Sequence, residues 1–357
     1  MLYTILAVLI VIGGVVIAHE LGHFVFAKLT GMRVEVFSIG FPPKIISKKI
    51  GETEYQLSAI PLGGYVKVSG VIDESFDTTA AESNEPWTFA GKKTWQKLLF
   101  ISGGVIFNVL FAFVIFSGLT MHEGIYEPVD KPIVESVAPG LPADSLGIKP
   151  GDIILAINGT AVESWSSMTE LIHSHPYDSI LIKWQSGGTI YEKKVKPAAN
   201  KILKGSELVE VGLIGISPTM NHRPAKFFES LDNGMQNTWY WLKITVISLK
   251  MLITGEESIK NIGGPIFIAQ LAGETAKFGF GSLLNLMAII SLNLALINIL
   301  PVPAFDGGHL LITLIEAIKR RPLSVNAKVR IQQIGIAIIL ILTVLVLFND
   351  ISRILKW

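Results

Sequence analysis

The sequence predicts a polytopic α-helical membrane protein that also carries one soluble α+β domain. Half of its 357 residues are hydrophobic, and the mean hydropathy of +0.51 is too high for a typical soluble protein. The apolar residues gather in four long runs, whereas one intervening segment alternates short strand-like stretches with Gly/Pro turns.

Four segments are predicted to cross the membrane. A span needs about 20 consecutive apolar residues, and the runs that meet or approach this length are residues 2–29, 98–120, 282–300 and 334–348. The first run lacks the basic start and the small-residue cleavage site of a signal peptide, so we expect it to be retained.

Lysine and arginine are concentrated in two of the loops. These lie between the first and second spans and between the third and fourth. Basic loops stay on the cytoplasmic side, so the N-terminus, the C-terminus and the long segment 121–281 are predicted to be extracytoplasmic. That long segment also carries lysines, but long loops translocate largely regardless of charge.

The extracytoplasmic segment contains a compact unit at about residues 132–217. Its predicted strands are PIVESV, DIILAING and ILIKWQ, with a helix near residues 166–175. The stretch PGLPADSLGIKPGDIILAING resembles bacterial PDZ domains, which capture an extended peptide beside a strand and a helix. A small α+β domain without a ligand is the alternative.

A second feature of this segment is MQNTWYWLKITVISLKMLI, residues 235–253. Its aromatic cluster and two lysines seven residues apart predict a helix that lies on the outer membrane surface. The alternative is a helix packed on the PDZ-like unit. The predicted organisation is therefore a first membrane half (1–120), a PDZ-like domain (121–220), a membrane-surface segment (221–280) and a second membrane half (281–357).

The polar stretch HELGH, residues 19–23, lies inside the first predicted span. His19 and His23 are four residues apart and share one face of a helix, so both imidazoles can bind one ion. Glu20 can then hold a water molecule whose pKa zinc lowers to about 7, and can move its proton. Uncompensated polar groups are costly in hydrocarbon, which favours a metal site over a polar cap at the membrane edge.

A catalytic zinc ion requires a third protein ligand. The candidate is Asp306 in NILPVPAFDGGHLL, where Pro301 and Pro303 interrupt the helix. The simpler role for Asp306 is a helix N-cap. The nearby His309 is interpreted as an outer or structural residue. Because the chain has no cysteine, thiolate ligands and disulfides are excluded.

These two motifs resemble those of the site-2 protease family of intramembrane zinc metalloproteases, and most closely the bacterial regulator-of-sigma-E protease type. HELGH and FDGGH (305–309) match the two metal motifs of the family. The resemblance implies one zinc ion held by His19, His23 and Asp306, with Glu20 as the general base. The chain departs from the family pattern in two ways. It has room for only one PDZ domain, whereas some members carry two, and Phe305 stands where leucine is usual before the aspartate.

The resemblance extends to residues outside the two metal motifs. Gly104 and Asn108 match a Gly-x-x-x-Asn element, in which the asparagine contacts substrate or the developing oxyanion, or simply joins two helices. YQLSAIPLGGYVKVSG (55–70), which contains Gly63, Gly64 and Tyr65, matches a membrane-associated β-hairpin or sheet element that pairs with unwound substrate; a plain cytoplasmic hairpin is the alternative.

Two asparagines lie in the third predicted span. The resemblance links Asn293 to substrate handling near the active site, whereas Asn298 precedes the proline loop and is expected to satisfy freed carbonyl groups.

The sequence thus predicts an intramembrane zinc endopeptidase of the bacterial cytoplasmic (inner) membrane, with its active site toward the cytoplasm. The expected substrates are single-span membrane proteins whose ectodomains have already been trimmed, such as anti-sigma factors or remnant signal peptides. A peptide C-terminus or segment is expected at the PDZ groove, and the lipid bilayer is the remaining partner. The net charge of +1 gives no sign of nucleic-acid binding.

Two other functions fit parts of this pattern. The first is a PDZ-bearing membrane scaffold with an inactive metal site, which would not need Glu20. The second is a divalent-metal transporter, which would need further polar groups along its spans.

Overall fold

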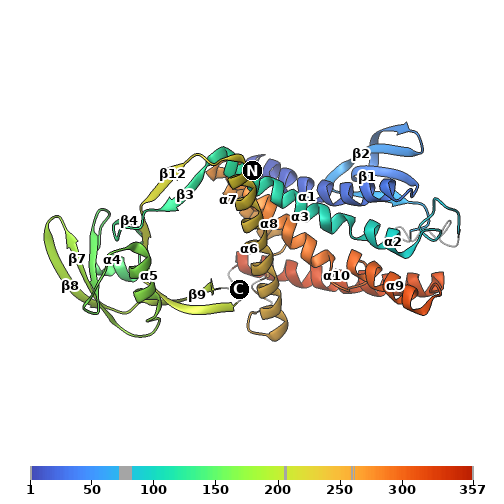
Figure 1. Ribbon diagram of the computed structural model, residues 1–357. Helices are drawn as coiled ribbons and strands as arrows, with labels where there is room; N and C mark the ends of the chain where they lie inside the picture. Colours follow the sequence, from blue (N-terminus) through green and yellow to red (C-terminus); the bar gives the residue numbers. More distant parts are fainter. Residues whose placement is uncertain (1, 72–82, 205–206, 259, 261, 356–357) are drawn as a thin grey trace. The chain divides into compact units, whose positions relative to one another are not determined.

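The computed structural model describes residues 2–71, 83–204, 207–258, 260 and 262–355. The chain divides into two compact units (Figure 1). Residues 1–120 and 227–357 form the membrane unit, and residues 121–226 form the second unit. The two segments of the membrane unit are far apart in the sequence but fold together.

In the described part of the membrane unit, four helices are long and apolar enough to cross a bilayer, which confirms the predicted number of spans. They are α1 (Leu2–Leu29), α3 (Gly103–Glu123), α8 (Phe280–Asn298) and α10 (Val325–Leu355). The second predicted span is divided at Ser102, because α2 (Thr94–Ile101) ends there. Helix α10 is longer than the predicted 334–348, since its first turns carry polar residues that a hydropathy criterion omits.

Helix α8 lies at the centre of the apolar packing. One cluster joins it to α1, and a second joins it to α3. In the first, Val11 and Val15 of α1 meet Met287 of α8; in the second, Phe116 of α3 meets Leu292. All five side chains are buried. This packing holds α1 in a fixed rotation, which decides where the polar groups of HELGH point.

The membrane unit also contains α6 (Phe227–Thr254), α7 (Pro265–Thr275) and α9 (Asp306–Lys319), with a 3₁₀ turn at Ala276–Phe278 after α7. Helix α6 contains the predicted amphipathic segment. It packs on α3, where Gly234 approaches Ser117, and on α8, where Thr245 donates a hydrogen bond of 2.7 Å to Asn293. These contacts are all within the membrane unit.

The β-element consists of β1 (Val34–Ile50) and β2 (Thr53–Val68), and begins earlier than the predicted 55–70. Each long strand bends, so four segments lie side by side. Residues 34–39 pair with 64–68 on one side and with 54–57 on the other, and 44–50 pair with 53–58. Among the described residues, 64–68 pair on one side only, which makes this segment an edge.

The second unit is the predicted α+β domain. Its main sheet has the order β6-β5-β7-β8, and its core includes Ile154, Met168, Ile182 and Trp184, each at most 2% exposed. The helices are α4 (Pro142–Leu146) and α5 (Trp165–His173). The strands are β3 (Ile125–Pro128), β4 (Val134–Val137), β5 (Ile153–Ile157), β6 (Thr160–Ala161), β7 (Ile180–Ser186), β8 (Thr189–Val195), β9 (Ala198–Lys204), β10 (Glu207–Leu213), β11 (Ile216–Pro218) and β12 (Met220–Arg223).

Candidate metal centre

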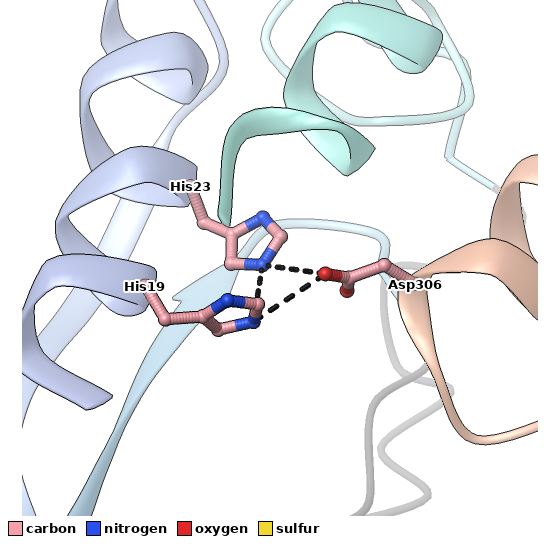
Figure 2. A group of neighbouring side chains, drawn as sticks. All are labelled: His19, His23 and Asp306. Carbon is pink, nitrogen blue, oxygen red and sulfur yellow. Dashed lines mark hydrogen bonds and ion pairs between the residues drawn. The ribbon is translucent and has the colours of Figure 1, made fainter. Parts of the chain in front are cut away.

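Helix α1 carries two histidines on one face, one turn apart. His19 and His23 are 8% and 9% exposed, and both rings point toward Asp306 (Figure 2). This follows from the helical repeat, because residues i and i+4 lie above one another. Glu20 is one position round the helix and lines the cavity in front of the two rings.

Asp306 reaches the site directly after the loop between α8 and α9. Pro301 and Pro303 interrupt the helix there, as the sequence predicts, and Ala304 adopts a left-handed conformation (φ 77°). A Cβ on Gly308 would overlap the Val302 carbonyl, so the loop is tightly folded. Irregular backbone at membrane depth is tolerated only when protein covers it or it lines a cavity.

Asp306 is the first residue of α9 and does not cap it. The N-cap position belongs to Phe305, so the simpler role suggested by the sequence is not the one observed. The carboxylate instead faces the histidines, and its Oδ2 is buried without a hydrogen-bond partner among the described residues. Its nearest partners are the two imidazole nitrogens, each 3.4 Å away, and a cation between the three groups would satisfy this oxygen.

The three ligand atoms form a nearly equilateral triangle. His19 Nε2 and His23 Nε2 are 3.3 Å apart, and each lies 3.4 Å from Asp306 Oδ2. These distances are long for hydrogen bonds. They match the separation of about 3.3–3.4 Å between ligand atoms in a tetrahedral zinc site with bonds of about 2.0–2.1 Å. The donor set and its spacing therefore fit a zinc ion.

Outer contacts hold the two imidazoles in place. His23 Nδ1 lies 3.1 Å from the Phe100 carbonyl oxygen. Since that oxygen can only accept, Nδ1 carries the proton and Nε2 presents its lone pair to the metal position. Phe100 lies in the last turn of α2, where the helix ends and its carbonyl group is within reach of α1.

Asn108 supports the other imidazole. Its Nδ2 lies 3.2 Å from His19 Nδ1, while its Oδ1 is buried without a partner in the described part of the chain. The two ends of an amide exchange by a 180° rotation. With Oδ1 turned toward His19, it would accept the Nδ1 proton and leave Nε2 for a metal. The side chain is 0% exposed, so the structure favours support of the ligand over contact with substrate.

Of the two asparagines of α8, Asn298 and not Asn293 lies at the metal centre. Asn293 does not line the cavity; its Oδ1 accepts a hydrogen bond from Thr245 of α6. Asn298 does line the cavity, and its Nδ2 lies 3.2 Å from His19 Nε2. The signal that could have found it is its spacing from the metal motif, since Asn298 ends α8 directly before the proline loop.

A cavity of about 1300 Å³ lies in front of the triangle. Gly63, Gly64 and Tyr65 of the hairpin edge line it, so the structure brings these predicted residues to the metal centre. A Cβ on Gly64 would lie 3.4 Å from Glu20 Cγ, which shows how closely the hairpin backbone approaches the carboxylate. His309 lines the same cavity, one turn of α9 after Asp306.

Proteins with similar sequences are named zinc metalloproteases. The chain is 34% identical to a predicted zinc metalloprotease of Clostridium acetobutylicum, over 98% of this chain and 97% of that protein. It is 30% identical to the zinc metalloprotease RasP of Geobacillus kaustophilus, over 99% and 98%. Among solved structures, the PDZ domain of an SdrC-like protein from Listeria monocytogenes matches 26% of this chain and 93% of that chain, at 25% identity and a TM-score of 0.21.

The model of the family described as Peptidase family M50 matches residues 7–342, which is nearly the whole chain. This range contains both metal motifs, α1 with its two histidines and the loop that carries Asp306. The predicted resemblance to site-2 proteases is confirmed, and the chain belongs to peptidase family M50.

Proposed function

We propose that this membrane zinc metalloprotease cuts single-span membrane proteins within their spanning segments, after their ectodomains have been trimmed. The observation that carries the proposal is the position of the ligand triangle. Two of its three corners belong to α1, one of the four helices that are able to cross a bilayer. A peptide bond presented to this site would therefore belong to a membrane-spanning segment.

His19, His23 and Asp306 would hold one zinc ion, for which their spacing is suited. Bound there, zinc would polarise the peptide carbonyl and lower the pKa of a water molecule. Glu20 lines the cavity beside the triangle. Its carboxylate takes the proton from the attacking water and then delivers it to the leaving amine.

The hairpin edge gives a helical substrate a way to unwind. A transmembrane helix hides its carbonyl groups in internal hydrogen bonds, and these must open before a bond is cut. Residues 64–68 pair on one side only within the described sheet, and Gly64 and Tyr65 line the cavity. The free side of this edge would re-pair the N–H and C=O groups that the unwound substrate exposes.

The remaining partners follow from the same architecture. The PDZ-like domain would bind a peptide C-terminus or segment between a strand and a helix, and the membrane unit would lie in a bacterial cytoplasmic membrane. The basic loops would keep the hairpin and the active site toward the cytoplasm, with both termini and the PDZ-like domain outside.

The test uses the full chain in detergent, a model single-span substrate and mass-spectrometric mapping of the cut. Wild-type protein should cut within the span, and the chelator 1,10-phenanthroline should stop it. Glu20→Gln should keep its zinc and lose cleavage, because only proton transfer is removed. The matched control is Glu163→Gln in the second unit, which should cut normally. Cleavage by Glu20→Gln would refute the proposed role of this carboxylate.

A further inference from the structure

The cavity continues beyond the metal centre, along α9 to the start of α10. Its lining includes Asp306 at one end of α9 and Glu316 near the other. Lys97 of α2, together with Lys328 and Gln332 of α10, also belongs to its wall. This far part of the cavity takes no part in the chemistry proposed above.

The length of α9 sets the distance between the two ends. Glu316 follows Asp306 by ten residues, and a helix rises about 1.5 Å per residue, so the separation is about 15 Å. An extended peptide advances about 3.3 Å per residue. A peptide cut at the metal centre would therefore reach the far end with a residue about four to five positions from the cut.

The far end of the cavity carries an excess of positive charge. Four basic residues line it, and Glu316 is the carboxylate among them in the described lining. Lys328 Nζ lies 2.8 Å from Glu316 Oε1 and so occupies it. The other three basic residues are Lys97, Arg320 and Arg321, for none of which an ion pair is found in the described part of the chain.

Lys97 is the most buried of these unpaired cations. Its Nζ lies 5.2 Å from the centre of the Phe89 ring. Burial lowers the pKa of Lys97 below its usual value, although the nearby Glu316 carboxylate partly opposes this. A partly desolvated ammonium group interacts strongly with an anion that enters the same space.

Gln332 adds a polar group that lacks a partner. It is 4% exposed, it lines the cavity, and its Nε2 has no hydrogen-bond acceptor among the described residues. Buried amide donors are almost always satisfied in folded proteins. An oxygen-rich ligand at this end of the cavity would satisfy it.

We propose that this basic end of the cavity binds a carboxylate of the peptide, held between Lys97 and Gln332. The inference rests on the proposed protease function. The carboxylate has two sources: an acidic side chain four to five residues from the cut in the intact substrate, or the new terminal carboxylate as the product leaves. Both are recognised by the same chemistry, and they are separable by experiment.

The first arm moves a single glutamate through positions two to eight on either side of the cut, in a substrate that is otherwise neutral there. For wild-type protein, kcat/KM should peak at four to five residues, about tenfold above the matched glutamine substrate. Lys97→Gln should reduce this ratio to about one, and Lys97→Arg should restore it. The control is Lys93→Gln, an exposed lysine of the same segment that is absent from the lining, and it should leave the ratio unchanged.

The second arm compares product peptides with a free or an amidated C-terminus as inhibitors. Stronger inhibition by the free acid, lost in Lys97→Gln, would identify the new carboxylate as the ligand even if the glutamate scan is flat. A flat scan together with equal inhibition by acid and amide overturns the proposal, while cleavage of the neutral substrate still supports the protease function. If wild-type protein cuts no substrate and Glu20→Gln behaves identically, both proposals fall.

Discussion

Asn108 lies directly behind His19: its amide nitrogen is 3.2 Å from Nδ1 of the imidazole, although 89 residues separate the two in the chain. The helix pair α1 and α3 therefore contributes to the metal centre as one structure. A group that fixes the far nitrogen of a ligating histidine sets its tautomer and its basicity. The structure thus assigns Asn108 a positioning role behind the ligand.

Replacing Asn108 separates this role from contact with substrate. Asn108→Ala should weaken zinc affinity about 10–100-fold, because His19 loses the acceptor that fixes its tautomer. Asn108→Asp should retain most of the affinity, since a carboxylate also accepts the Nδ1 proton. Competition with a fluorescent chelator measures both values. Unchanged zinc affinity in Asn108→Ala, with a large loss of kcat, would instead indicate that the amide contacts the reacting peptide.

Gly104 allows α3 to approach the two imidazoles. A Cβ at this position would lie 2.6 Å from His19 Nδ1 and 2.6 Å from His23 Nε2. Gly104→Ala should therefore displace both rings and abolish stoichiometric zinc binding, measured by elemental analysis of the purified protein. The control is Gly118→Ala in the same helix, where a Cβ meets nothing within 4 Å. Full zinc content in Gly104→Ala would contradict the close approach.

The sequence alone predicts which three candidate ligand side chains the structure brings together, but it predicts the positions of the surrounding residues poorly. His19 and His23 are fixed by the helical repeat, and Asp306 by its motif after two prolines. The roles of Asn293 and Asn298 depend on the rotation of α8, and a helix that is apolar on most sides carries no pattern that reveals it. That rotation comes from packing against α1 and α3, which involves residues far apart in the chain.

The hairpin illustrates a second limit. Alternation in residues 55–70 predicts the strand that contains Gly64, but β1 begins at Val34 and runs through Phe41, two prolines and Lys44. Prolines are rare within strands, so this stretch gives little strand signal. Tertiary pairing with β2 on both sides of residues 34–39 overrides the local preference.

A pair of glycines lets α1 meet the start of α3. A Cβ on Gly22 would overlap the Gly103 carbonyl, so Gly22→Ala forces the two helices apart. Overpacking of this kind costs about 1–3 kcal/mol, and thermal unfolding in detergent should show a lower Tm. Gly13→Ala in the same helix is the control, because its nearest atom, the Pro61 carbonyl oxygen, is 3.6 Å away. Equal melting temperatures would contradict the tight contact.

Asp350 fixes the start of α7 from the end of α10. It is 2% exposed, and its two oxygens accept hydrogen bonds of 3.0–3.1 Å from the backbone N–H groups of Gly264, Ile266 and Phe267. The first turn of a helix has N–H groups without intrahelical partners, and here a carboxylate from another helix supplies the acceptors. The Arg353 guanidinium lies 4.8 Å from the Phe267 ring and adds to the same junction.

Asp350→Ala should therefore leave three backbone donors at the start of α7 without acceptors and destabilise the membrane unit by about 1–3 kcal/mol. Helix α7 packs on α1, where Ala272 joins the cluster of Val11 and Val15, so the loss should also lower zinc retention on heating. Melting followed by circular dichroism, with zinc release monitored in parallel, measures both effects. Ser352→Ala, two residues away and without a hydrogen bond in the described structure, should melt like wild type. If Asp350→Ala also does so, the carboxylate does not hold α7, and the helix depends on its apolar contacts with α1 alone.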